Sequence, residues 1–190
     1  MYSFNITEFF IKGGIFMYPI AICSVISLAI FMERLWSLRR KKVFPESLLP
    51  KLERLINEGK IPESIALCKA DNSSMGRLVM AGINNSDKKR ELIKEAMQET
   101  GSREAVYLEK YMEALSTIAG VSTLLGLLGT IQGMIIIFSM ISIESTVNPQ
   151  ALAGGISTAL NTTAAGLVVA IPTTIFYKYL MGKAETMVVE

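Results

Sequence analysis

The chain has 190 residues, 51% of them hydrophobic and 19% charged, with a formal net charge of +2. That apolar fraction is too high for an ordinary soluble domain, and no basic stripe interleaved with aromatic residues suggests a nucleic-acid partner. The sequence has no histidine, no phosphate-binding loop, no metal-ligand cluster and no nucleophile beside a base, so we expect neither an enzyme nor a cofactor.

Three long uncharged stretches are the main structural signal. The first runs from Gly13 to Met32, and the others lie between Glu113 and Glu144 and between Glu144 and Lys178. Each reaches the roughly 20 residues that a helix needs to cross the hydrocarbon core. We therefore predict an all-α integral membrane protein with three transmembrane helices, at residues 13–35, 114–141 and 151–177, and an outer interfacial segment at residues 1–12.

The positions of Lys and Arg predict the orientation of the chain. Of 19 such residues, 15 lie between Arg39 and Lys110, and basic residues near span ends mark the cytoplasmic side of a bacterial inner membrane. Residues 36–113 and the tail at 178–190 are then cytoplasmic, while the N-terminus and the loop at 142–150 are periplasmic.

Short helices are expected in the first half of the cytoplasmic segment. Pro45 and Pro62 each suit the first turn of a helix, and an acidic residue follows each of them. Gly59 is expected to end the first helix, residues 71–74 to break the second, and residues 75–83 to form a third.

A much longer helix is expected in the second half of the segment. Ser86 is a suitable N-cap with Asp87 in the first turn, and no proline appears from there to Ile141. We predict one continuous helix of roughly 80 Å, in which the second span extends into a cytoplasmic stalk.

Small residues on the second and third spans predict close helix packing, because helices in lipid associate through surfaces that approach closely. Gly129 and Gly133 form a GxxxG pair. The predicted packing residues are Gly126, Gly129, Gly133, Gly155 and Gly166.

Polar residues on the same spans have two interpretations. Ser116, Thr123 and Thr130 recur every seven residues, Thr158, Asn161 and Thr162 lie together, and Thr163 points away from that group. Each hydroxyl either bonds its own helix backbone or helps to line a polar interior. No Asp, Glu, Lys, Arg or His lies deep in these two spans, so any proton-carrying acid must come from another polypeptide.

Two long motifs carry a family resemblance. The sequence GLLGTIQGM at 126–134 and the sequence GISTALNTTAAGL at 155–167, followed by Ala-Ile-Pro at 170–172, resemble the second- and third-span motifs of the MotA/TolQ/ExbB proton-channel family. Three spans with a cytoplasmic segment after the first are similar to the ExbB/TolQ branch, and the resemblance covers nearly the whole chain.

The resemblance implies a ring-forming subunit of an ion-driven motor. It implies a homo-pentamer around a dimer of an ExbD/TolR-like single-span partner that supplies a protonatable Asp, with a TonB- or TolA-like protein as a further partner. It places Thr130 and Thr163 on the ion pathway, and the wider set of polar candidates is Thr123, Thr158, Asn161 and Thr162. The process served would be uptake or envelope maintenance.

One departure from the family pattern is Thr158, which stands where ExbB and TolQ commonly have Glu. The driving ion, H⁺ or Na⁺, therefore stays open. Two alternatives also remain: a passive oligomeric membrane scaffold, and a MotA-like flagellar stator subunit, although MotA has four spans and a longer chain.

Overall fold

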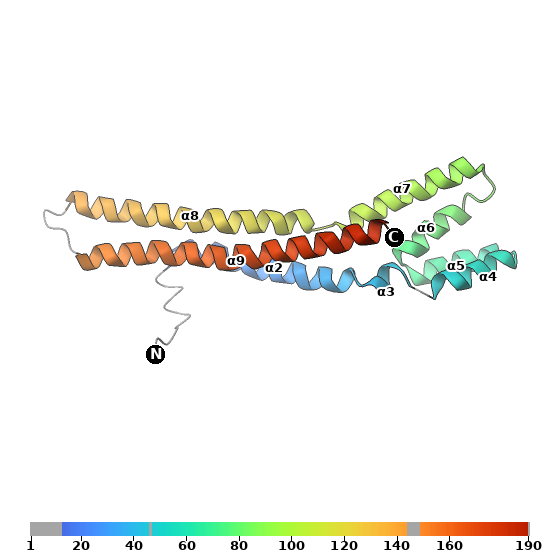
Figure 1. Ribbon diagram of the computed structural model, residues 1–190, viewed down its shortest axis with the longest axis horizontal. Helices are drawn as coiled ribbons and strands as arrows, with labels where there is room; N and C mark the ends of the chain where they lie inside the picture. The colour runs from blue at the N-terminus through green and yellow to red at the C-terminus, as the bar shows by residue number, and fades with distance from the viewer. Residues whose placement is uncertain (1–12, 46, 144–148, 190) are drawn as a thin grey trace. The chain divides into compact units, whose positions relative to one another are not determined.

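A computed structural model describes residues 13–45, 47–143 and 149–189, and within these ranges the regular structure is entirely helical (Figure 1). The chain divides into two compact units. The described part of the first unit, here the membrane unit, comprises residues 13–31, 111–143 and 149–178. That of the second unit comprises residues 32–45, 47–110 and 179–189.

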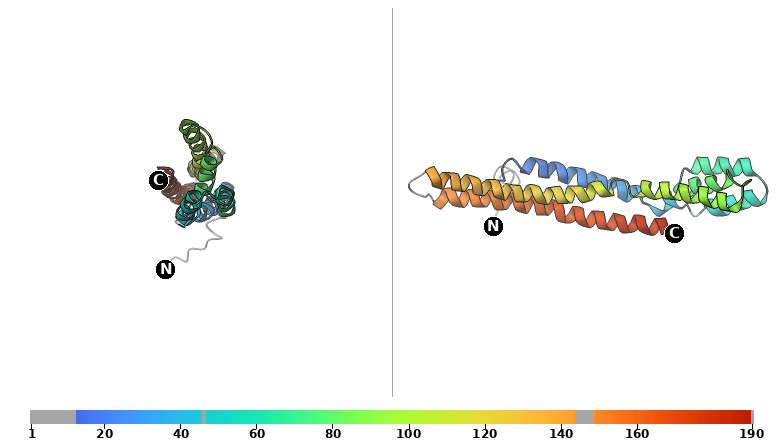
Figure 2. Two further views of the ribbon diagram at one scale, coloured as in Figure 1. Left: turned by 90° about the vertical axis from the view of Figure 1, so that its right-hand side faces the viewer. Right: turned by 90° about the horizontal axis from the view of Figure 1, so that it is seen from above.

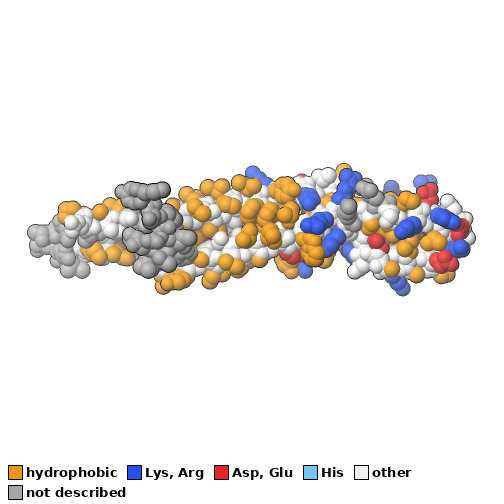
Figure 3. Space-filling model, turned by 90° about the horizontal axis from the view of Figure 1, so that it is seen from below, with side chains coloured by type: hydrophobic (Ala, Val, Ile, Leu, Met, Phe, Trp, Pro, Cys, Tyr) orange, Lys and Arg blue, Asp and Glu red, His pale blue; other side chains and the backbone are white. Residues whose placement is uncertain are grey.

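Three helices are long and apolar enough to cross a membrane, which confirms the predicted all-α fold with three spans. They are α2 (Met17–Ser37), α8 (Met112–Ile143) and α9 (Pro149–Val189). Apolar side chains cover much of the surface of the spans that is visible in Figure 3. The protein is therefore a multi-pass membrane protein.

Within the membrane unit, α8 and α9 run antiparallel and side by side (Figure 2). The start of α2 packs on this pair, where Met17 and Ile20 form a buried cluster with Ala165 of α9 and contact Leu125 of α8. Further along α2, the ring of Phe31 stacks on that of Phe176 with centroids 3.9 Å apart. Thus α2 lies against one side of the α8–α9 pair.

The second unit consists of α3 to α7 together with the ends of α2 and α9. These five helices are α3 (Arg40–Val43), α4 (Leu48–Asn57), α5 (Ile61–Asp71), α6 (Ser74–Ile83) and α7 (Arg90–Leu108). The third span continues into this unit as predicted, because α9 extends to Val189.

The predicted breaks between the first short helices are confirmed. Gly59 adopts φ +73 just after α4, Pro62 lies in the first turn of α5, and Asn72 ends α5 with φ 48. The hydroxyl oxygen of Ser73 accepts a hydrogen bond from the backbone N–H of Gly76 at 3.0 Å and so caps α6.

The predicted N-cap at Ser86 is wrong, because α7 begins at Arg90 and is preceded by Lys89. The chain makes successive tight turns after α6: the N–H of Ser86 donates to Ile83 O, and that of Lys88 to Asn85 O. The side chain of Asn85 also donates to Ala81 O at 2.8 Å. These local bonds compete with helix formation, so the stalk helix starts later than the capping pattern suggests.

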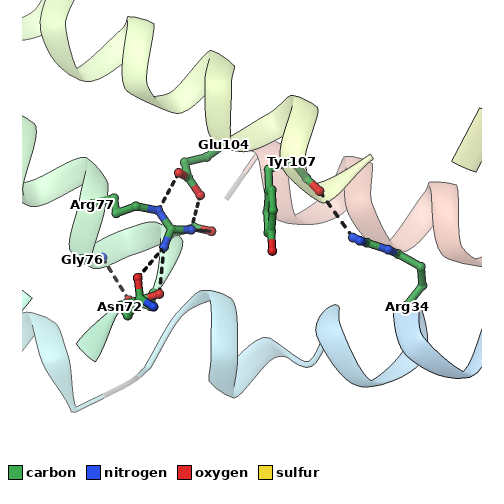
Figure 4. Close-up of polar contacts among 8 residues, drawn as sticks. Arg34, Asn72, Gly76, Arg77, Glu104 and Tyr107 are labelled. Atoms are coloured by element: carbon green, nitrogen blue, oxygen red, sulfur yellow. Dashed lines mark hydrogen bonds and ion pairs between the residues drawn. The ribbon is translucent and has the colours of Figure 1, made fainter. Parts of the chain in front are cut away.

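The predicted continuous stalk helix is also wrong, because α7 ends at Leu108 and α8 begins at Met112. Tyr111 has φ 67, a left-handed conformation that only few non-glycine residues adopt. Neither Gly nor Pro marks this break in the sequence. A long-range contact lies beside it, since the buried guanidinium of Arg34 donates to Tyr107 O in the last turn of α7 (Figure 4).

Candidate functional site

The contact between α8 and α9 depends on glycine. A methyl group placed on Gly133 would lie 2.7 Å from Ala159 Cβ, and one placed on Gly126 would lie 3.2 Å from Thr163 Cα. A methyl group on Gly129 would overlap the Thr162 side chain. The three glycines therefore allow the backbones to approach more closely than larger residues would permit.

Glycines of α9 complete the same contact from the other side. A methyl group on Gly166 would lie 2.6 Å from Ser122 O, and one on Gly155 would lie 2.6 Å from Ile137 Cγ1. The structure thus brings all five sequence-predicted packing glycines to one helix–helix contact. Ser122, which sequence reasoning did not single out, is fully buried there, and its hydroxyl has no hydrogen-bond partner among the described residues.

On the side of this pair that faces α2, threonines make packing contacts. Thr162 is 1% exposed, and its single hydroxyl proton has two carbonyl acceptors within reach, Gly13 O at 2.5 Å and Thr158 O at 2.9 Å. The hydroxyl of Thr158 in turn donates to Gly154 O at 3.1 Å. Nothing in the sequence pattern pointed to Gly13 as a partner, because the two residues are 149 positions apart.

Asn161 precedes Thr162 on the same helix and is half-buried. At about 100° per residue, its side chain points away from the α8 contact and toward the edge of the α2 side. No described residue forms a hydrogen bond with its amide. The group Thr158, Asn161 and Thr162 therefore lies together, as predicted, but on the α2 side of the pair.

Three other threonines lie on the opposite side of the pair. Around α8, Thr130 and Thr123 are displaced by about 40° and 60° from Gly126, whereas Leu125, which contacts α2, is displaced by about 100° in the other direction. Around α9, Thr163 is likewise displaced from Gly166 away from the side of Ala165. We call Thr123, Thr130 and Thr163 the open-face threonines, because α2 does not cover them.

Each open-face hydroxyl already donates a hydrogen bond to a backbone carbonyl. Thr123 donates to Ala119 O at 3.1 Å and Thr130 to Leu127 O at 2.6 Å. Thr163 differs, because it donates across the contact to Gly126 O of α8 at 2.9 Å. A hydroxyl whose proton is engaged still offers oxygen lone pairs, so this face presents acceptors but few donors.

The second unit holds its own polar network, drawn in Figure 4. The Arg77 guanidinium forms two hydrogen bonds of 2.6 Å with the carboxylate of Glu104 and also donates to Asn72 O. The bond from Arg77 holds the pKa of Glu104 below its usual value, and Glu104 in turn raises the pKa of Arg77. This bidentate pair joins α6 to α7.

Arg34 forms a second polar contact of this unit near the end of α2. Its side chain is 3% exposed, its Nε lies 2.8 Å from a carboxylate oxygen of Glu33, and its Nη1 donates to Tyr107 O at 3.4 Å. Its contact with α7, 73 residues away, is visible only in the structure.

Comparison with known proteins identifies related sequences. The family model described as the MotA/TolQ/ExbB proton channel family matches residues 70–190. A Synechocystis protein named as biopolymer transport protein ExbB-like 1 is 31% identical over 180 residues, which cover 90% of this chain and 69% of that protein.

Two further relatives have similar names. ExbB-like 3 of Synechocystis is 32% identical, with 86% of this chain and 79% of that protein covered. An ExbB homolog of Methanothermobacter thermautotrophicus is 25% identical, with 95% of this chain and 64% of that protein covered. These relatives are similar to the chain over most of its length.

Proposed function

The chain belongs to the MotA/TolQ/ExbB proton channel family, and we propose that it is the ring subunit of a motor driven by the ion-motive force across a bacterial inner membrane. In this proposal five copies surround a dimer of a single-span, ExbD/TolR-like partner. Ion flow then drives a TonB- or TolA-like protein that transmits force toward the outer membrane. The names of the relatives, which describe biopolymer transport, favour an ExbB-like role over a flagellar one.

The observation that carries the proposal is the arrangement of the open-face threonines. Thr130 and Thr163 come from different helices, yet both lie on the side of the α8–α9 pair that α2 leaves uncovered. Such a face suits the interior of a ring better than lipid, because the hydroxyl oxygens keep lone pairs that hydrocarbon cannot satisfy. Their hydroxyl oxygens would accept hydrogen bonds from water or coordinate a cation along the ring axis.

The proposed pathway needs a titratable group from outside this chain. Between Glu113 and Lys178 the only charged residue is Glu144, which lies between the two spans. A proton relay through a membrane uses Asp, Glu or His. We therefore propose that a carboxylate on the partner's span faces Thr130 and Thr163, and that protonation of this carboxylate is coupled to movement of the partner within the ring.

The orientation belongs to the same proposal. The concentration of 15 of the 19 basic residues between Arg39 and Lys110 supports a cytoplasmic location for the second unit. The N-terminus and the segment between α8 and α9 are then periplasmic. Force delivered to the outer membrane would leave through the periplasmic part of the partner, because the short segment between α8 and α9 offers no domain on that side.

The direct test is the mass of the intact complex, gently extracted from the native membrane. We expect five copies of this chain and two copies of a small protein with one span and an Asp within it. A homo-oligomer without any such subunit would contradict the motor, because no proton carrier would remain. That result would favour a passive scaffold held together by the glycine contacts.

A further inference from the structure

The inner end of the first span exposes a large aromatic ring. Trp36, in the last turn of α2, is 60% exposed, whereas Leu38 and Val43 close by are 0% and 4% exposed. The chain leaves the helix at Arg39, which has extended φ and ψ of −77 and 127, and then forms the short α3. The apolar side chains of this turn are buried, and the indole is left outside.

A cation contacts this exposed indole, and further exposed cations follow it in the sequence. The ammonium of Lys42 lies over the Trp36 ring, 3.9 Å from its centroid. Arg39, Arg40 and Lys42 are all exposed. Among the described residues, no carboxylate forms an ion pair with Arg39 or Lys42, so both remain available to an anion.

The general rules for membrane proteins explain the charge but not the arrangement. Basic residues mark the cytoplasmic end of a span and complement the negative end of a helix dipole. Either role would be satisfied by basic residues at any nearby position. Neither requires an exposed indole with a lysine stacked on its face, which fixes the cation at the level of an aromatic belt residue.

We propose that Trp36, Arg39 and Lys42 form a binding site for the headgroup of an anionic phospholipid. The Arg39 guanidinium binds the phosphate through paired N–H donors, and the Lys42 ammonium, held over the indole, adds a second positive charge. The indole itself lies between headgroup and acyl chain, where its apolar body and polar edge are both accommodated. This site depends on membrane insertion and not on the motor function.

The chain carries its own probe for this site, because Trp36 is its only tryptophan. Bromine atoms on lipid quench indole fluorescence only at short range. The purified protein is reconstituted in vesicles of phosphatidylcholine with about one fifth phosphatidylglycerol. In one preparation the phosphatidylglycerol is brominated, and in the other an equal mole fraction of the phosphatidylcholine is brominated. Both leaflets have the same composition, so the direction of insertion does not affect the result.

The expected result is stronger quenching by the brominated phosphatidylglycerol, by on the order of threefold or more at low ionic strength. Equal quenching by the two lipids would overturn the proposal, and this comparison needs no variant. Addition of millimolar inorganic phosphate should leave the preference unchanged. Loss of the preference under that condition would identify a soluble anion, and not a lipid, as the ligand.

Variants then test the residues. The double change Arg39→Gln and Lys42→Gln should remove the preference, while Lys51→Gln, an exposed lysine on α4, should leave it intact. A preference that survives the double change would assign lipid binding to other residues and would contradict the site. Helical content by circular dichroism confirms that the variants compared are folded.

Discussion

The close approach of α8 and α9 makes Gly166→Ala the most informative single substitution. The added methyl group would lie 2.6 Å from Ser122 O and 3.0 Å from Gly126 Cα, both of them backbone atoms that cannot rotate away. Restoring an ordinary contact requires the helices to separate by about 0.8 Å. That separation also lengthens the bond from Thr163 to Gly126 O, now 2.9 Å. We expect a loss of about 1–3 kcal/mol in the free energy of unfolding.

Two control variants on α9 separate this effect from the effect of replacing any helical glycine by alanine. Gly154→Ala introduces the same methyl group where no atom lies within 4 Å, and Gly155→Ala meets only the movable side chain of Ile137 within 3.4 Å. Unfolding in mixed detergent micelles, followed by circular dichroism on the dissociated subunit, should rank Gly166→Ala as the most destabilising of the three. If Gly166→Ala and Gly154→Ala unfold alike, the close backbone contact described here is wrong.

Three further sets of substitutions test the pathway, the second unit and the helix break. Thr130→Val and Thr163→Val should each abolish ion flux into proteoliposomes containing the complete complex while leaving assembly intact. The control Thr117→Val, on the opposite face of α8, should leave the flux unchanged. Unchanged flux in both pathway variants would refute the proposed route. Glu104 has a lowered pKa in the folded protein, so its stabilising effect is present above about pH 4.5, the pKa in the unfolded chain, and is lost as the pH falls through the pKa in the folded protein. Glu104→Gln should lower the free energy of unfolding by about 1 kcal/mol at neutral pH and make stability less dependent on pH in the acid range. The free energy of unfolding should be about 1 kcal/mol higher for Tyr111→Gly than for Tyr111→Ala, because glycine adopts the positive φ of this position without strain. In thermal unfolding, a continuous helix through residue 111 would give the opposite order.

The sequence was sufficient for the spans and for most of the short helices. Uncharged runs, Gly59, Pro62 and the polar residues at 71–74 are local signals, and local signals determined those elements. The break between Leu108 and Met112 has no local signal, because neither Gly nor Pro lies there. The contact of Arg34 with a carbonyl beside the break joins residues 73 positions apart, and helix propensity carries no information about such contacts.

In the candidate site, too, local sequence signals predicted some features, and long-range contacts determined the others. Small residues at helical spacing predicted which glycines pack, and the structure places all five at one contact. The faces of the polar residues were harder to predict, because periodicity gives the angle between Thr162 and Thr163 but not the position of α2. That position depends on Met17 and Ile20 packing against Ala165, which is a long-range contact.

The position of α2 also gives a physical meaning to the departure at Thr158. Thr158 lies on the α2 side, where its methyl group would be 3.9 Å from a Cβ placed on Gly14, and its hydroxyl bonds within its own helix. The proposed pathway follows the opposite side, through Thr130 and Thr163. A threonine at position 158 therefore removes no carboxylate from that pathway, and the proposal requires the titratable group to come from the partner alone.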